Sequence, residues 1–200
     1  MHPYVQALTL SDIESCVKLE EAAFPPTERC SREKFEYRLT KAGNICLGLF
    51  SSSTLTTIDD PPITFETSRP ADSFHPARTS VLIGHVIATK TCNDTIHDED
   101  MAIDLDWQRR STSNVPSSHH PELGRTVAIH SLSILPQYQR GRLGEMLLGA
   151  YCQRIESSGL ADRIALLTYD RLVDFYVRQG FHNCGPSKAT FGGQAWNDLV

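Results

Sequence analysis

Four elements follow one another closely in the last third of the chain, and this succession constrains the fold more than any other part of the sequence. Residues 125–135 (RTVAIHSLSIL) are rich in β-branched and apolar side chains, as in a strand. After a short turn, residues 139–157 repeat apolar side chains at the spacing of an amphipathic helix. Residues 163–168 (RIALLT) form a continuous apolar run, which is typical of a strand at the buried centre of a sheet. A second helix is predicted over 170–179.

The preceding part of the chain supplies further elements of the same kind, recognised by capping residues and by apolar spacing. They are strands over 4–10, 44–50 and 79–91 and helices over 11–23 and 31–40. One or two short strands close the chain. The order is therefore βααββ followed by βαβαββ, which predicts a mixed α/β sheet flanked by helices around one core.

Two polar regions interrupt this order. Residues 51–79 are rich in Ser, Thr, Pro and Asp and lack periodicity, so we expect a long loop or insertion there. Residues 92–123 form a second irregular region, in which a short helix is expected around 98–109. Because neither flank of these regions could fold alone, we expect a single domain over 1–200 with insertions at about 51–79 and 92–123.

Composition and charge exclude several classes of function. Of the 200 residues 40% are hydrophobic and 22% are charged, which is a globular balance. The formal net charge of −5 disfavours nucleic acid as the main partner and is compatible with a cationic small molecule. No apolar run is long enough to cross a membrane, and no secretory signal is recognisable. The six cysteines form no CxxC pair or zinc spacing, so we expect reduced thiols in the cytoplasm and no metal.

The turn between the strand at 125–135 and the following helix carries the first candidate binding site. Its sequence is QRGRLG over residues 139–144. The first backbone N–H groups of a helix lack partners within the helix, and together with the helix dipole they can bind a pyrophosphate. Arg140 and Arg142 add positive charge. The pattern is neither a Walker A loop nor a dinucleotide fingerprint, and taken alone it is equally typical of a solvated helix end.

The residues from His130 to Tyr151 resemble the acetyl-CoA-binding motif of the GNAT N-acetyltransferases, Gln/Arg-x-x-Gly-x-Gly/Ala after a strand. Gln139 matches the first position and Gly144 the last, with Arg142 where the family usually has glycine. Moving the register by one residue puts Gly141 in that place but leaves Leu143 in the final small position, so we prefer the first register. Together with ALLTYDRLVDFYVRQGF, this stretch is most similar to arylalkylamine (serotonin-type) and fungal polyamine N-acetyltransferases.

The resemblance implies the GNAT fold, with acetyl-CoA bound in the gap between splayed strands four and five. The main chain of Leu132 and Ile134 would pair with the pantetheine as a neighbouring strand would. The turn and the start of the helix would hold the pyrophosphate, through Gln139, Arg140, Gly141, Arg142, Leu143, Gly144 and Glu145.

The chemistry of acetyl transfer directs attention to His130 and Tyr176. An alkylammonium of pKa about 10.4 is neutral in only about one molecule in 2,500 at pH 7, so a base must take its proton. His130 has a suitable pKa range and matches the second of two strand histidines in the vertebrate arylalkylamine enzymes, the first being Ala128 here. Tyr176 matches the family tyrosine that protonates the leaving thiolate. Without the resemblance, both would be read as structural residues.

The acceptor is expected to be a small primary arylalkylamine or polyamine, which attacks the thioester directly in a ternary complex. By resemblance, Phe24 and Ile129 would line its pocket. The acidic stretch from Asp94 to Asp106 would concentrate a cation, although it is more typical of a solvated face. The alternatives are a protein or peptide N-acetyltransferase and a non-catalytic acyl-CoA-binding protein.

Overall fold

A computed structural model describes residues 2–54, 69–70, 74, 78–104, 106–108, 119–139 and 141–200. Within them all strands join one sheet in the order β1-β2-β4-β5-β6-β8-β7, and β3 also pairs with β4. The strands are β1 (His2–Ala7), β2 (Leu47–Thr54), β3 (Arg69–Pro70), β4 (Arg78–Thr91), β5 (Thr126–Ile134), β6 (Arg163–Thr168), β7 (Asn183–Pro186) and β8 (Asn197–Leu199).

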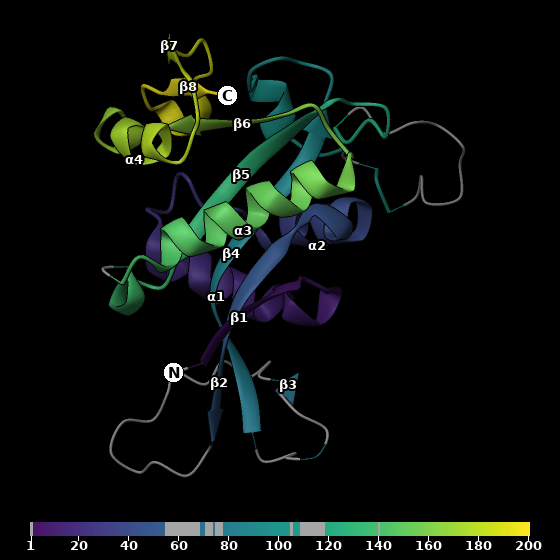
Figure 1. The fold of residues 1–200 in the computed structure, drawn as a ribbon. Helices are drawn as coiled ribbons and strands as arrows, with labels where there is room; N and C mark the ends of the chain where they lie inside the picture. Colours follow the sequence, from purple (N-terminus) through teal and green to yellow (C-terminus); the bar gives the residue numbers. More distant parts are fainter. Residues whose placement is uncertain are drawn as a thin grey trace.

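Neighbouring strands are antiparallel except β5 and β6, which are parallel and are joined by a helix. The helices are α1 (Ile13–Ala23), α2 (Arg32–Ala42), α3 (Leu143–Ser158) and α4 (Val173–Arg178). Figure 1 shows α3 in front of the sheet, α1 and α2 behind it, and α4 beside the strands at the C-terminal end. In the described part of the chain no helix combines the length and apolar content that a membrane span requires. The mixed α/β sheet expected from the sequence is confirmed.

The core lies between the sheet and the helices on both of its faces. Leu19 of α1 and Phe35 of α2 are fully buried on one face, and Leu147 and Tyr151 of α3 on the other. The hydroxyl of Tyr151 donates to the main-chain carbonyl of Ile45 at 2.9 Å, so this large side chain is buried with its polar atom satisfied. These contacts fix α3 against the sheet and thereby set the position of its first turn.

Two β-bulges shape the central strands. Between β2 and β4 the register shifts after Leu49, which pairs with Gly84, because Phe50 pairs with Leu82 and leaves Ile83 as an extra residue of β4. In the pairing of β4 with β5, Ile87 lies opposite Ser131 and Ala88 lies opposite Ile129. His130 is therefore an extra residue of β5 with no partner residue in β4. A bulge bends a strand and redirects a side chain. The bulge in β5 therefore decides where the histidine points.

Helix beginnings differ from expectation at two places. The helix expected from residue 11 is preceded by a 3₁₀ turn that Thr9 caps, with its hydroxyl and main-chain amide both donating to Asp12. The helix expected from Gln139 begins at Leu143, because residues 136–138 form a 3₁₀ turn and Arg142 has left-handed backbone angles. The second helix begins as predicted, with the hydroxyl of Ser31 accepting the Lys34 amide.

The two irregular regions are narrower than expected. β2 continues to Thr54 and β4 begins at Arg78, so both strands extend into the predicted insertion at 51–79, and β3 lies within it. The remainder of that insertion falls outside the described residues. In the second region, the expected helix around 98–109 is only a 3₁₀ turn over Asp98–Met101. Most of the polar loop after residue 108 also lies outside the described part.

Candidate active site

β5 and β6 separate partway along their length. They pair from Thr126 opposite Arg163 to Ile129 opposite Leu166, where the pairing ends. The amide of Leu135 donates to the carbonyl of Ile83 in β4 at 2.9 Å. Because polar groups of successive strand residues point to opposite sides, those of Leu132 and Ile134 face the gap toward β6. The gap therefore presents main-chain groups to an extended ligand.

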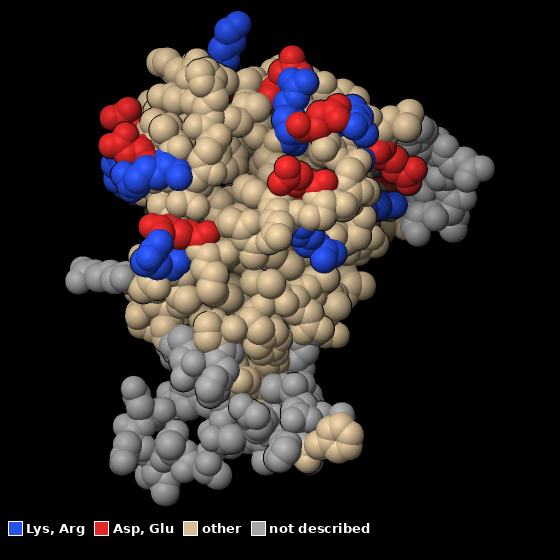
Figure 2. Space-filling model, viewed as in Figure 1, with Lys and Arg blue, Asp and Glu red and all other residues tan. Residues whose placement is uncertain are grey.

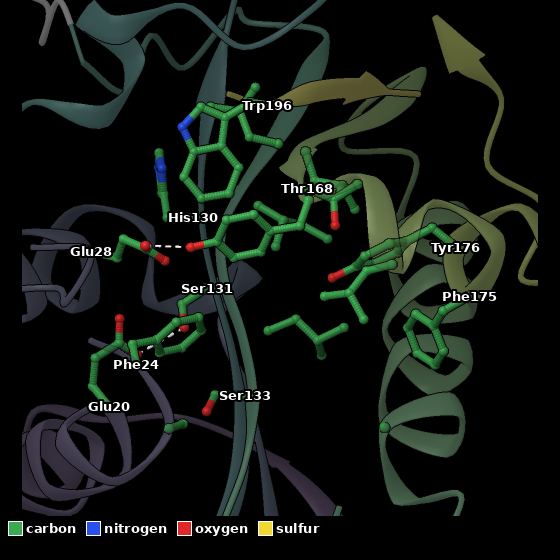
Figure 3. Close-up of a pocket in the computed structure, with 18 of the residues that line it drawn as sticks. Glu20, Phe24, Glu28, His130, Ser131, Ser133, Thr168, Phe175, Tyr176 and Trp196 are labelled. Atoms are coloured by element: carbon green, nitrogen blue, oxygen red, sulfur yellow. Dashed lines mark hydrogen bonds between the residues drawn. The ribbon is translucent and has the colours of Figure 1, made fainter. Parts of the chain in front are cut away.

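A cavity of about 530 Å³ occupies this gap. Its walls come from the end of α1, β5, the start of α3, the end of β6 with the turn that follows, α4, and the C-terminal segment. Several of the sequence-predicted residues meet there, namely Phe24, Ile129, His130, Leu132, Ile134, Gln139, Gly144 and Tyr176. Figure 3 shows the labelled side chains arranged around the opening. Residues of the predicted motif at the start of α3 and the predicted Tyr176 thus line the same cavity.

The start of α3 has the geometry of an anion-binding turn. Arg142 adopts φ 60°, a left-handed conformation that glycine favours, at the position where the GNAT pattern has glycine. A Cβ on Gly144 would lie 3.8 Å from Phe175 and 3.9 Å from Ile134, so this position accepts nothing much larger than alanine without filling the cavity. These two features agree with the first register of the motif.

The side chain of Arg142 does not enter the cavity. It is 87% exposed, and its Nε donates to Glu145 at 2.9 Å. The cavity lining does not include Gly141, Arg142, Leu143 or Glu145, although Gln139 and Gly144 belong to it. Arg140 lies outside the described residues. The side-chain amide of Gln139 donates to the Ile134 carbonyl at 3.0 Å, which ties the turn to the open edge of β5.

Tyr176 lies on the opposite side of the cavity from α1. Its side chain is 8% exposed, and burial raises the pKa of its hydroxyl above the usual value of 10. Figure 3 shows the hydroxyl pointing into the cavity. Among the described residues it has no hydrogen-bond partner, whereas the rings of Phe175 and Phe181 hold the phenol at 5.0 and 5.8 Å between centroids. A protonated donor therefore faces the space where a ligand would lie.

His130 is positioned by the bulge and lines the cavity, but both of its ring nitrogens have neighbours. Nε2 lies 2.7 Å from the hydroxyl of Thr89, and Nδ1 lies 3.3 Å from the sulfur of Met101. Burial lowers the pKa of His130 well below its usual 6.5, and the nearby cations Arg38 and Lys34 lower it further. The imidazole is therefore neutral at pH 7 and is a weak base.

Sequence reasoning missed the acidic and aromatic part of the wall. Glu20 and Glu28 both line the cavity, and they are 2% and 8% exposed. Glu20 accepts hydrogen bonds from Ser131 at 2.9 Å and from the Cys30 amide at 3.0 Å. Glu28 lies in the segment after Pro25-Pro26, which the sequence marks only as the end of a helix.

Tyr169 and Trp196 also line the cavity, with ring centroids 4.7 Å apart. Tyr169 follows directly on the last residue of β6, and ligands of α/β sheets commonly bind at the carboxyl ends of strands. This rule could have identified Tyr169 from the sequence as a residue of the site. No sequence feature indicated Trp196, because only the fold brings it to the cavity.

The acidic stretch between residues 94 and 106 is mainly occupied in structural contacts. Asp98 accepts from the amide and hydroxyl of Thr190, and Asp100 accepts from the side chain of Asn93 and the amide of His97. Within this stretch Met101 alone belongs to the cavity lining as far as the described residues go. The reading of these acids as a solvated, structural segment is the better one.

Comparison with known proteins agrees with this geometry. A family model described as an acetyltransferase (GNAT) domain matches residues 117–195. Serotonin N-acetyltransferase of Macaca mulatta is 29% identical over 93 residues, and that of Homo sapiens is 28% identical over the same length. The alignment covers 46% of this chain and 46% and 45% of those proteins, so the chain matches about half the length of these curated relatives.

Solved structures share the whole architecture at low sequence identity. The loading GNATL domain of CurA from Lyngbya majuscula superposes with a TM-score of 0.65 at 13% identity, covering 100% of this chain and 96% of that one. NAA60 of Arabidopsis thaliana in complex with acetyl-CoA has a TM-score of 0.61 at 15% identity, covering 98% and 96%. The splayed parallel strands, the motif at the start of α3 and the family match over residues 117–195 show that the chain has the fold of the GNAT acetyltransferases and is similar to them in sequence.

Proposed function

We propose that the protein is an acetyl-CoA-dependent N-acetyltransferase that acts on a small primary amine. One observation carries the proposal: a single cavity connects the open edge of β5, the first turn of α3 and the hydroxyl of Tyr176. These are the three groups that an acyl-CoA thioester needs, for its pantetheine arm, its pyrophosphate and its departing sulfur. The resemblance of residues 130–151 to the GNAT motif gives the same assignment from the sequence.

The main chain of β5 binds and orients the donor in this proposal. Leu132 offers its amide and carbonyl to the pantetheine, and Ile134 offers its amide, because its carbonyl already accepts from Gln139. The amides of Leu143, Gly144 and Glu145 belong to the first turn of α3 and have no acceptor inside the helix. With the helix dipole they favour the pyrophosphate.

Acetyl transfer requires the acceptor amine to lose a proton. Making an alkylammonium neutral at pH 7 costs about 4–5 kcal/mol. We assign His130 to this end of the cavity, where it helps to deprotonate the amine through water. This role requires one ring nitrogen to exchange its present neighbour, Thr89 or Met101, for that water. Its lowered pKa means that it passes the proton on to solvent and does not store it. The amine nitrogen then forms the new bond to the acetyl carbon while the carbon–sulfur bond breaks.

Tyr176 receives the departing sulfur. Its raised pKa keeps the phenol protonated across the physiological range, so it donates a hydrogen bond to the thiolate. A thiol has a pKa of about 8.5, so the thiolate takes up a proton readily once it has left the acetyl group. No thiol of this chain lines the cavity among the described residues, in keeping with direct attack and no acyl-enzyme intermediate.

The similarity to serotonin N-acetyltransferases supports an arylalkylamine acceptor, and the resemblance of the sequence to fungal polyamine N-acetyltransferases supports a polyamine. The cavity also has the composition for such a ligand, with Phe24, Trp196 and two carboxyl groups in its wall. Peptide acceptors are the second candidate, because the NatC complex, which was solved with a Gag peptide and CoA, has this fold.

A thiol-release assay with acetyl-CoA and a panel of acceptors tests the proposal. Tryptamine, spermidine and a peptide with a free N-terminus are compared side by side. We expect release with at least one of the two small amines. Release with the peptide alone would refute the small-amine acceptor. Calorimetric binding of acetyl-CoA without release for any acceptor would identify a non-catalytic acyl-CoA-binding protein.

A further inference from the structure

Glu28 has a carboxylate oxygen that nothing in the described protein satisfies. Its side chain is 8% exposed, one oxygen accepts the hydroxyl of Tyr169, and the buried Oε2 has no hydrogen-bond partner among the described residues. No ion pair of the described residues involves this carboxylate. A buried carboxylate oxygen without a hydrogen-bond partner destabilises a folded protein. Because this oxygen lines a cavity, it is a candidate acceptor for a hydrogen bond from a bound ligand.

Two aromatic rings line the same cavity as this carboxylate. The ring of Tyr169 lies 4.7 Å from that of Trp196, and the indole N–H of Trp196 donates to the Phe191 carbonyl at 2.7 Å. The indole is therefore fixed with its polar atom already used, so it presents ring surface to the cavity. Figure 3 shows Glu28 on the same side of the cavity as Trp196 and across the cavity from Tyr176. Aromatic faces and a carboxylate together are the usual receptor for an ammonium group.

The charge balance of the cavity also favours a cation. Besides His130, which is neutral, its charged lining consists of Glu20, Glu28 and Arg171. The guanidinium of Arg171 already lies over one face of the Tyr169 ring, 4.2 Å from its centre, so the aromatic surface left for a ligand ammonium is mainly that of Trp196, while Tyr169 holds Glu28 through its hydroxyl. Glu20 is satisfied by Ser131 and Cys30, so Glu28 is the carboxylate that remains available.

We propose that Glu28, Tyr169 and Trp196 form a binding site for a second, non-reacting ammonium group, so that the preferred acceptor is a diamine or a longer polyamine. This inference rests on the proposed function. A carboxylate stabilises the charged form of an amine held against it, which would oppose attack by that same nitrogen. It suits a nitrogen that stays protonated while the other end of the molecule reaches the thioester near Tyr176.

The test compares 1,4-diaminobutane with butylamine, which has the same carbon chain and lacks the second ammonium. We expect the wild-type KM for the diamine to be lower by about 10- to 100-fold, the range of one hydrogen bond to a charged group. Glu28→Gln keeps the shape and removes the charge, so it should raise the KM for the diamine by that factor. The KM values for butylamine and acetyl-CoA should change less than about threefold. Glu21→Gln, an exposed neighbour on α1, is the matched control and should behave as wild type.

Calorimetric binding of 1,4-diaminobutane to the wild type and to Glu28→Gln, with CoA present, tests the site without turnover. Loss of binding in the variant, with an unchanged thermal unfolding curve, supports the site even if no amine is acetylated. Equal KM values for the two amines in the wild type would overturn the inference. So would a Glu28→Gln variant in which both amines lose the same factor, while thiol release itself would still uphold the proposed function.

Discussion

At the scale of single residues, the structure distinguishes groups that face a ligand from groups that serve the fold. Tyr176 has a free hydroxyl in the cavity, whereas Tyr151, which is also buried, donates its hydroxyl to the Ile45 carbonyl. Both are tyrosines on apolar helix faces, and the sequence pattern is the same for both. Only the partner of the hydroxyl separates a structural tyrosine from a candidate acid.

Tyr176→Phe tests this distinction. Loss of the hydroxyl removes the hydrogen bond to the departing sulfur, so we expect turnover to fall by about 10- to 100-fold. The dissociation constant for acetyl-CoA should remain within about twofold, because the ring still fills its place. Steady-state thiol release and calorimetry measure the two quantities. Unchanged turnover at every pH would remove Tyr176 from the mechanism.

Arg142 carries backbone strain that a glycine would relieve. A left-handed conformation costs about 1–2 kcal/mol for a residue with a side chain, and its exposed ion pair with Glu145 contributes little. We therefore expect Arg142→Gly to raise the free energy of unfolding by about 1 kcal/mol in urea denaturation. Arg142→Ala keeps the Cβ and should leave stability within about 0.5 kcal/mol of the wild type. Equal effects of the two substitutions would show that the backbone angle is not the cause.

At the scale of elements, the splay of β5 from β6 depends on how tightly β5 packs on its other neighbour. β4 and β5 are in contact along most of their length, from Gly84 opposite Ile134 to Thr91 opposite Thr126. A Cβ on Gly84 would come within 2.4 Å of Ile134 and 2.8 Å of the Ser133 carbonyl. The missing side chain at Gly84 lets the two strands approach where β5 must leave β6.

Gly84→Ala should accordingly destabilise the protein, by about 1–3 kcal/mol as for other overpacked cores. Gly149→Ala is the control, because that glycine lies exposed on α3 with nothing within 4 Å of a Cβ. It should stabilise the protein by up to about 1 kcal/mol through helix propensity. Urea denaturation of both variants provides the comparison. A Gly84→Ala variant as stable as the wild type would contradict the close approach of the strands.

His120 ties the segment before β5 to β4, and it makes this link sensitive to pH. Its Nδ1 accepts the Lys90 amide at 2.9 Å, and burial, with Lys90 nearby, lowers the pKa of His120 from 6.5 to about 4. The folded state therefore binds fewer protons than the unfolded state between these two values. Stability from this group is fully present above pH 6.5 and is lost as the pH falls toward 4.

The loss assigned to His120 is on the order of 3 kcal/mol over that interval. His120→Asn can still accept the Lys90 amide through its carbonyl oxygen but does not titrate. We expect the free energy of unfolding of this variant to fall less steeply between pH 6.5 and 5 than that of the wild type. Identical slopes would mean that His120 is protonated in the folded protein. His130 remains in both proteins and contributes in the same direction.

At the scale of the whole molecule, charge is spread in local pairs. Figure 2 shows acidic and basic side chains interleaved on the viewed face, separated by wide uncharged surface. Three exposed pairs are Arg125–Asp162, Arg163–Asp94 and Arg142–Glu145. Such pairs contribute little to stability. The net charge of −5 attracts cations weakly and without distinguishing between them, so the choice of the amine substrate depends on the cavity.

Ligand binding should stabilise the whole molecule through the cavity. Acetyl-CoA at about 100 times its dissociation constant adds about 2.7 kcal/mol to the free energy of unfolding, which for a chain of this size raises Tm by about 5–10 °C. Gly144→Leu should abolish this shift, because its side chain would occupy the space beside Phe175 and Ile134. Gly149→Leu, on the exposed face of the same helix, should keep it. A full shift in Gly144→Leu would place the donor elsewhere.

The sequence by itself determined the order of elements and the motif at the start of α3, because hydrophobic periodicity and helix-boundary residues are local signals. It also determined the candidates His130 and Tyr176, through their place in recognisable stretches. Only the tertiary structure decided that the imidazole lies between Thr89 and Met101, because no sequence periodicity marks a bulge. Likewise, Glu28 and Trp196 are 168 positions apart in the chain. They share a cavity wall because β8 pairs with β6, which brings the C-terminal segment next to the residues that follow α1.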